Sequence, residues 1–128
     1  SFFSTAVATT TTPPPAVRRR SVVTVHVSAA GYSSTPGYGM VNLMAQTRHL
    51  NGKVYAASAF SPVLVQRMVG RTWRTVLTVT TGKDGLVFKT IVAPSGRQSY
   101  RLIRPQGATV TAATSSVMTV YVPYTPGC

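Results

Sequence analysis

Apolar side chains recur at every second position in this chain, and this period constrains its fold more than any other feature of the sequence. Val23, Val25 and Val27 alternate with Thr24 and His26. A period of two places the apolar side chains on one face of a half-buried strand. Further short runs of β-branched and apolar residues occupy positions 41–45, 63–65, 73–79, 86–92, 100–104 and 116–122. No window follows the helical period, so the sequence predicts an all-β fold.

Turn signals separate these runs. Residues 81–85 supply two glycines that tolerate positive φ and an aspartate that can cap its own turn, so we expect a hairpin that leads into residues 86–92. Gly96 and Gly107 mark two later reversals. Residues 48–61 are irregular: Asn51-Gly52 is a candidate turn, and positions 55–60 form either a loop or an added strand. About seven strands with connecting loops predict a sandwich or a barrel.

Length and composition fit one β domain that follows a tail. A chain of 128 residues with 44% hydrophobic side chains suffices for one core. We expect residues 1–20 to form the tail, because Thr-rich and Pro-rich stretches are extended and do not fold alone. Residues 21–128 then form the β domain. The tail carries Phe2, Phe3 and Val7, which would dock either on the chain's own domain or on a neighbouring subunit.

The charge of the chain is one-sided. Lys and Arg together number 13 against a single acidic residue, Asp84, which gives a formal net charge of +12. A positive field attracts nucleic acid, cell-wall polymer, acidic polysaccharide or an anionic membrane surface. The alternative is a solvated surface that serves solubility, although ordinary soluble surfaces mix both signs. The anion-binding candidates are Arg18, Arg19, Arg20, Arg71, Arg74, Arg97, Arg101 and Arg104.

Few side chains could support catalysis or metal binding. The candidates are Asp84, His26, His49 and Cys128, and Asp84 is expected to hydrogen-bond turn amides. We expect His26 on an exposed sheet surface and His49 in a loop. Neither histidine has a neighbour at metal-site spacing, and one acidic side chain excludes a carboxylate pair. We therefore expect no enzymatic activity, no metal site and no cofactor.

Three residues have structural interpretations. Trp73 alternates with Leu77 and Val79, which favours a place in the core over a ligand-stacking platform. Tyr100 is expected to be a second core anchor. Cys128 is the only cysteine and cannot form an intramolecular disulfide. It is therefore an unpaired end, a truncation point or half of an intermolecular disulfide.

A series of motifs lies along residues 62–122: Val63-Leu64-Val65-Gln66-Arg67, Gly70-Arg71-Thr72-Trp73, Asp84-Gly85, Tyr100-Arg101-Leu102 and Ser116-Val117-Met118-Thr119-Val120. Together they resemble the immunoglobulin-like domains of secreted and cell-surface bacterial proteins of actinobacterial type. The resemblance implies an immunoglobulin-like sandwich of about seven strands in an extracellular setting. The start at Ser1 in place of Met suggests export, and the lack of an apolar run of about 18 residues argues against a transmembrane segment.

Two classes of function follow from these features. The first is an extracellular structural protein, a subunit of a surface filament, appendage or shell, whose tail adds to a sheet edge of a neighbouring subunit. The alternative is a basic anion-binding module for cell-wall polymer, acidic polysaccharide or nucleic acid, including a viral coat or decoration protein. The expected partners are other copies of the chain in the first case and an anionic polymer in the second.

Overall fold

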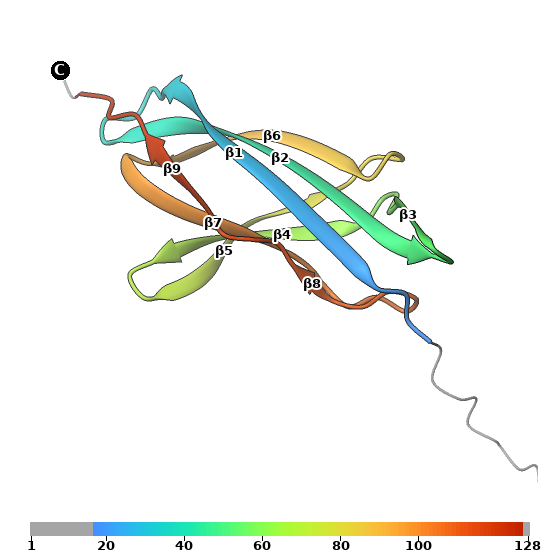
Figure 1. Cartoon of the computed structure of the whole chain (residues 1–128). Coiled ribbons are helices and arrows are strands. Elements are labelled where there is room, and N and C mark those ends of the chain that lie inside the picture. The colour runs from blue at the N-terminus through green and yellow to red at the C-terminus, as the bar shows by residue number, and fades with distance from the viewer. Residues whose placement is uncertain (1–16, 127–128) are drawn as a thin grey trace, which may run out of the picture.

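Two antiparallel sheets form the structure, a computed structural model that describes residues 17–126 (Figure 1). The described residues contain strands and no helix, so the fold is all-β as predicted, and the two sheets lie face to face as in a β-sandwich. The strands are β1 (Ser21–Tyr32), β2 (Tyr38–Asn51), β3 (Val54–Ala57), β4 (Pro62–Val69), β5 (Thr72–Thr80), β6 (Leu86–Pro94), β7 (Gly96–Arg104), β8 (Ala113–Thr114) and β9 (Met118–Val122).

Each sheet has one long central strand. In the first sheet β2 pairs with β1 on one side, and on the other side with β6 and then with the short β3. In the second sheet β4 lies between β5 and β7, and the far side of β7 pairs with β9 and then with β8. Strand β6 therefore forms an edge of the first sheet, and β5 forms an edge of the second.

Each predicted run overlaps a strand, although the last strand begins at Met118 and not at Ser116. The described residues contain nine strands where about seven were expected, because the short β3 and β8 are added. Asn51-Gly52 is a turn, as expected, and it joins β2 to β3 with Gly52 at a φ of 68°. Positions 55–60 are divided, because β3 ends at Ala57 and the remainder is a loop.

The predicted hairpin at residues 81–85 is wrong in its pairing, although the turn is present. The Leu86 carbonyl accepts the Gly82 N–H at 2.8 Å, but β5 and β6 belong to different sheets. The turn crosses from one sheet to the other because hydrogen bonds hold its two ends to segments outside β5 and β6. The buried Thr81 donates its hydroxyl to the Ser58 carbonyl at 2.7 Å, and the Gly85 carbonyl accepts the Thr47 N–H at 2.9 Å.

The core fills the space between the two sheets. Burial of a Val or Leu side chain stabilises the fold by about 1.5–3 kcal/mol, so a layer of such residues is its main support. Tyr100 is fully buried in this layer, whereas Trp73 is not part of it. The buried cluster consists of Val23, Val27, Val41, Leu43, Ala45, Val63, Val65, Val79, Ala93, Tyr100, Leu102, Val120 and Val122.

The segment before β1 is attached to the chain's own domain. The Arg19 N–H donates to the Thr109 carbonyl at 2.8 Å, and the Arg19 carbonyl accepts the Thr111 N–H at 2.9 Å. These bonds form a parallel bridge, so the end of the predicted tail already belongs to the sandwich. The docking residues Phe2, Phe3 and Val7 lie outside the described residues, as does Cys128.

Candidate binding surfaces

The outer face of the second sheet carries a fixed arginine. Arg101 alternates with the fully buried Tyr100 and Leu102, so its side chain points away from the core. Its Nε donates to Gln66 Oε1 at 2.8 Å, and its guanidinium carbon lies 4.5 Å from the centroid of the Trp73 ring. A cation stacked on an aromatic ring gains about 0.5–1 kcal/mol at exposed sites. Arg101 is thus held in one orientation by two contacts.

Trp73 lies on this outer face because β5 contains a bulge. Val65 pairs with Leu77, but the next residue of β4, Gln66, pairs with Thr75, which leaves Val76 as an extra residue. A bulge of one residue reverses the alternation beyond it. Trp73, assigned to the core from its spacing to Leu77, is therefore turned outward and is only half buried.

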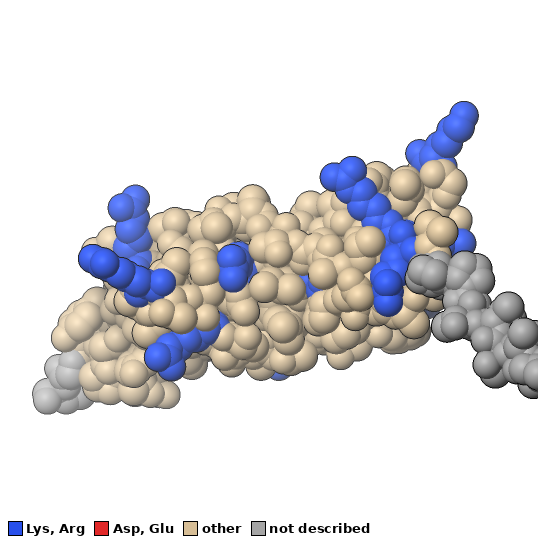
Figure 2. All heavy atoms as spheres, turned by 90° about the horizontal axis from the view of Figure 1, so that it is seen from below, with Lys and Arg blue, Asp and Glu red and all other residues tan. Residues whose placement is uncertain are grey.

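The same face continues along β7 toward β9. Arg97 is four positions before Arg101 and has Tyr121 as its cross-strand partner, and that tyrosine is 75% exposed. Between them the Ser99 and Thr119 hydroxyls share a hydrogen bond of 3.0 Å. We call the surface formed by Arg97, Arg101, Gln66, Trp73 and Tyr121 the arginine platform. Figure 2 views the molecule from this side and shows several Lys and Arg side chains with no acidic side chain among them.

The remaining candidate arginines are divided among other places. Arg18 donates from Nε to the Gly107 carbonyl at 3.0 Å, and Arg19 donates from Nη1 to Asn51 Oδ1 at 2.9 Å, so both are tied to the end of the domain near β8. Arg20 borders a pocket at that end. The exposed Arg71 lies between β4 and β5, and Arg74 is exposed on β5. The eight arginines therefore do not form one face.

Arg104 is buried. Only 8% of its surface is exposed, Nη1 donates to the Pro105 carbonyl at 2.6 Å, and Nε has no hydrogen-bond partner among the described residues. Burial lowers the pKa of this guanidinium because the charged form is less well solvated. The position is a structural one and is not available to a polymer on the surface.

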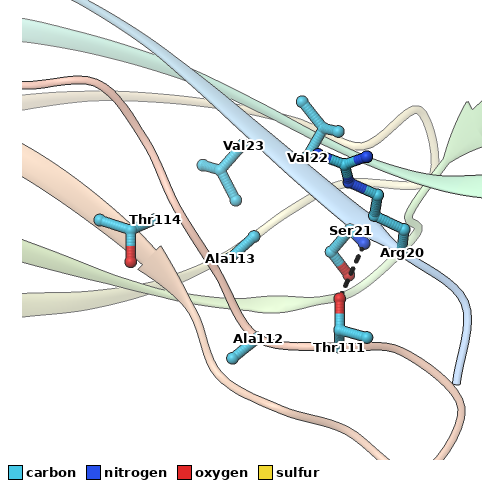
Figure 3. Close-up of a pocket in the computed structure, with 8 residues that line it drawn as sticks. All are labelled: Arg20, Ser21, Val22, Val23, Thr111, Ala112, Ala113 and Thr114. Carbon is cyan, nitrogen blue, oxygen red and sulfur yellow. Dashed lines mark hydrogen bonds between the residues drawn. The ribbon is translucent and has the colours of Figure 1, made fainter.

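A pocket of about 360 Å³ lies where β1 begins, between that strand and the segment that enters β8 (Figure 3). The Ser21 N–H donates to Thr111 Oγ1 across it at 3.1 Å, whereas the buried Ser21 Oγ has no partner among the described residues. The lining residues are Arg20, Ser21, Val22, Val23, Thr111, Ala112, Ala113 and Thr114. The pocket is a gap between two strand edges, and Arg20 supplies the one charged side chain in its lining.

The outer face of the first sheet carries no Lys or Arg over most of its area. Its exposed apolar side chains are Met44 on β2 and Leu86, Phe88 and Val92 on β6, with exposed fractions of 41% to 59%. Thr24, His26, Asn42, Gln46 and Thr90 occupy the other outward positions of this region. We call this region the uncharged face. Sequence analysis missed it, although the alternation of Leu86, Phe88, Thr90 and Val92 was visible as a signal.

The edge of the first sheet beside this face is open. Among the described residues β6 pairs with β2 alone, so one row of its backbone N–H and C=O groups has no strand partner. Lys89 occupies an inward-facing position on this edge strand, between Val87 and Ile91, and its side chain is exposed. An inward charge on an edge strand discourages indiscriminate pairing of edges.

Two of the other candidate chemical groups, His49 and Asp84, make hydrogen bonds within the fold. His49 is half buried within β2, not in a loop, and its Nδ1 lies 2.8 Å from Ser58 Oγ. His26 is exposed on the sheet surface. Asp84 Oδ1 accepts the Leu86 N–H at 3.1 Å within the turn. Within residues 17–126 no group of three or more His, Cys, Asp or Glu side chains is placed to hold a metal ion, and no helix could cross a membrane.

Comparison with known proteins gives no match: no family model, no curated protein and no solved structure is significantly similar to this chain.

Proposed function

We propose that this chain is an immunoglobulin-like structural module of an extracellular assembly, without enzymatic activity, in which the N-terminal segment of one copy adds to the open β6 edge of the next. The strand order supports the immunoglobulin-like assignment. Without the short β3 and β8, seven strands remain: β1, β2 and β6 share one sheet, and β4, β5, β7 and β9 share the other. In the immunoglobulin constant domain the first, second, fourth and fifth strands share one sheet and the third, sixth and seventh share the other. The present division is the same except that β5, the fourth of the seven strands, pairs with β4, the third.

The uncharged face carries the proposal. Two copies with a net charge of +12 repel one another, and this repulsion is weakest when the contacting surfaces lack charge, because salt screens the more distant cations. The uncharged face offers such a surface, and its exposed Phe88, Val92 and Met44 gain about 25 cal/mol for each Å² of apolar area that a partner covers. The open edge of β6 adds main-chain hydrogen bonds along the same strand.

The N-terminal segment is the occupant that fits this edge. Residues 1–16 contain no charged side chain and include Phe2, Phe3 and Val7. Fully extended, they span about 50 Å, which exceeds the roughly 30 Å that the nine residues of β6 cover. Pairing of β6 with β6 of another copy would instead bring two Lys89 side chains to one seam. The uncharged segment avoids that repulsion.

An extracellular setting and a filament, appendage or shell as the product are part of the proposal. They follow from the resemblance of residues 62–122 to secreted bacterial domains.

The test is the oligomeric state of two variants, measured by sedimentation across a concentration series. Deletion of residues 1–16 keeps the Arg19 bridge to Val110 and is expected to leave a folded monomer. Phe88→Lys, at a position that is 59% exposed, is expected to weaken assembly about tenfold or more, because a new charge lies in the seam.

Val117→Lys is the matched control, since Val117 is 53% exposed and lies between β8 and β9, away from the uncharged face. It introduces the same charge and should leave assembly within about twofold of the parent chain. A truncated chain that assembles like the parent would contradict the proposal, and so would equal effects of Phe88→Lys and Val117→Lys.

A further inference from the structure

We propose that the arginine platform is a binding site for an acidic polysaccharide, whose carboxylate or sulfate groups pair with Arg101 and Arg97. This site goes beyond the proposed assembly, because it lies on the opposite sheet from the uncharged face. It also differs from a general attraction of the chain for anions, since it depends on two particular side chains.

The first step of the argument is the state of Arg101. An arginine fixed in advance loses less conformational entropy when it binds. Here the Trp73 ring stacks on the Arg101 guanidinium, and Gln66 Oε1 accepts the hydrogen bond that Arg101 Nε donates. The two terminal nitrogens of Arg101 make no hydrogen bond within the described residues. Those nitrogens therefore point to an oxyanion as their partner, because a guanidinium edge matches a carboxylate or sulfate with two parallel hydrogen bonds.

The second step is the lack of an internal partner. The one acidic side chain of the molecule, Asp84, is engaged in the turn between β5 and β6. Neither Arg97 nor Arg101 makes an ion pair with another side chain of the described residues. The favourable Coulomb energy of both guanidinium groups thus remains available to a ligand.

The third step identifies the ligand class. Arg97 and Arg101 lie on one strand four residues apart, about 13 Å along β7, so a single small anion cannot contact both and a linear polymer can. Between them lie the hydroxyl groups of Ser99 and Thr119, which bond one another and keep further acceptor capacity, whereas the Gln66 amide is already engaged by Arg101 and Thr75. Such groups suit the many hydroxyls of a sugar chain. Of the two aromatic rings on the platform, Trp73 is covered by Arg101 and Tyr121 alone is open for stacking, which disfavours single-stranded nucleic acid.

Binding of the full chain to heparin, measured by calorimetry at about 0.15 M salt, tests the site, because that salt screens distant charges. Arg97→Gln together with Arg101→Gln should weaken binding about tenfold or more, through the loss of charge-assisted hydrogen bonds. The control pair Lys53→Gln and Lys83→Gln removes the same charge at exposed positions outside the platform and should weaken binding less than about threefold.

Arg101→Lys keeps the net charge at +12 but removes the planar fork, and it should weaken heparin binding about threefold or more. Equal losses for the platform pair and the control pair, or unchanged binding by Arg101→Lys, would overturn the site. A single-stranded DNA oligomer that binds more tightly than heparin, with the same dependence on Arg101, would overturn the ligand class. Weak binding of that oligomer, insensitive to Arg101→Lys, supports it.

Discussion

At the scale of single residues, the hydroxyl of Tyr100 is an unusual component of the core. Tyr100 is fully buried, and its oxygen has no hydrogen-bond partner of good geometry among the described residues. Burial raises the pKa of this hydroxyl, and the nearby Arg67 guanidinium reduces the shift without reversing it. A buried polar atom without a partner costs about 1–3 kcal/mol, so the ring stabilises the core while its oxygen opposes that gain.

Tyr100→Phe should therefore be about 1 kcal/mol more stable than the parent chain at neutral pH, because it removes a buried polar atom that has no hydrogen-bond partner among the described residues. The pH dependence has a definite sign. Because the folded-state pKa lies above the unfolded value of about 10, the contribution of Tyr100 is intact below pH 10 and declines as pH rises past it. Urea unfolding from pH 8 to 11 should show the parent chain losing stability faster than Tyr100→Phe. Parallel curves would contradict this.

The comparison of Tyr100 with Trp73 shows what alternation can predict for a residue. Both were assigned to the core from the period of their strands, and only Tyr100 lies there. The difference is Val76, one extra residue in β5, which turns every side chain before it to the opposite face. The sequence of β5 carries no turn residue at this point, so the bulge and the stacking of Arg101 on Trp73 could not be anticipated.

At the scale of elements, turn chemistry predicts where the chain reverses but not which strand it then joins. The predicted runs form strands because alternation depends on local burial, which each segment displays by itself, whereas the short β8 was not predicted and the short β3 was only one of two alternatives for its segment. The partners of β6 depend on contacts far away in sequence, such as the Thr47 N–H that donates to the Gly85 carbonyl. That pairing places Leu86, Phe88 and Val92 beside Met44 of β2, so the alternation along β6 could be read from the sequence but its neighbours on the uncharged face could not.

The turn at Gly85 provides a test at this scale. Gly85 has a φ of 75°, and an added Cβ would lie 2.5 Å from the Thr47 carbonyl oxygen, so Gly85→Ala should destabilise the fold by about 2–4 kcal/mol. Gly52→Ala is the control, because Gly52 has a φ of 68° but open space around it, and its cost should be near 1 kcal/mol. Thermal unfolding of both variants measures the difference. Equal losses would mean that the approach to Thr47 is unimportant.

At the scale of the whole molecule, the two sheets divide the surface by charge. The uncharged face lies on the first sheet and the arginine platform on the second, so the proposed assembly and the proposed polyanion site use opposite sides of the molecule. The composition revealed the excess of cations but not this division, since the outward positions are known only once the strands are assigned to sheets. The same excess makes the molecule repel itself, and this repulsion can be measured.

Stability should rise with salt in a chain that has 13 cationic side chains and one acidic side chain. Raising NaCl from about 0.01 to 0.5 M shortens the screening length from roughly 30 Å to less than 10 Å, which weakens repulsion in the folded state more than in the expanded unfolded chain. We expect a gain of about 1 kcal/mol, or a Tm higher by about 4 °C, in dilute protein where assembly does not contribute.

Lys53→Glu with Lys83→Glu, both at exposed positions, should raise the Tm at low salt and reduce its salt dependence. A Tm that is independent of salt in the parent chain would show that the cations are too far apart to interact, and the uncharged face would then lose its advantage as the surface through which copies meet.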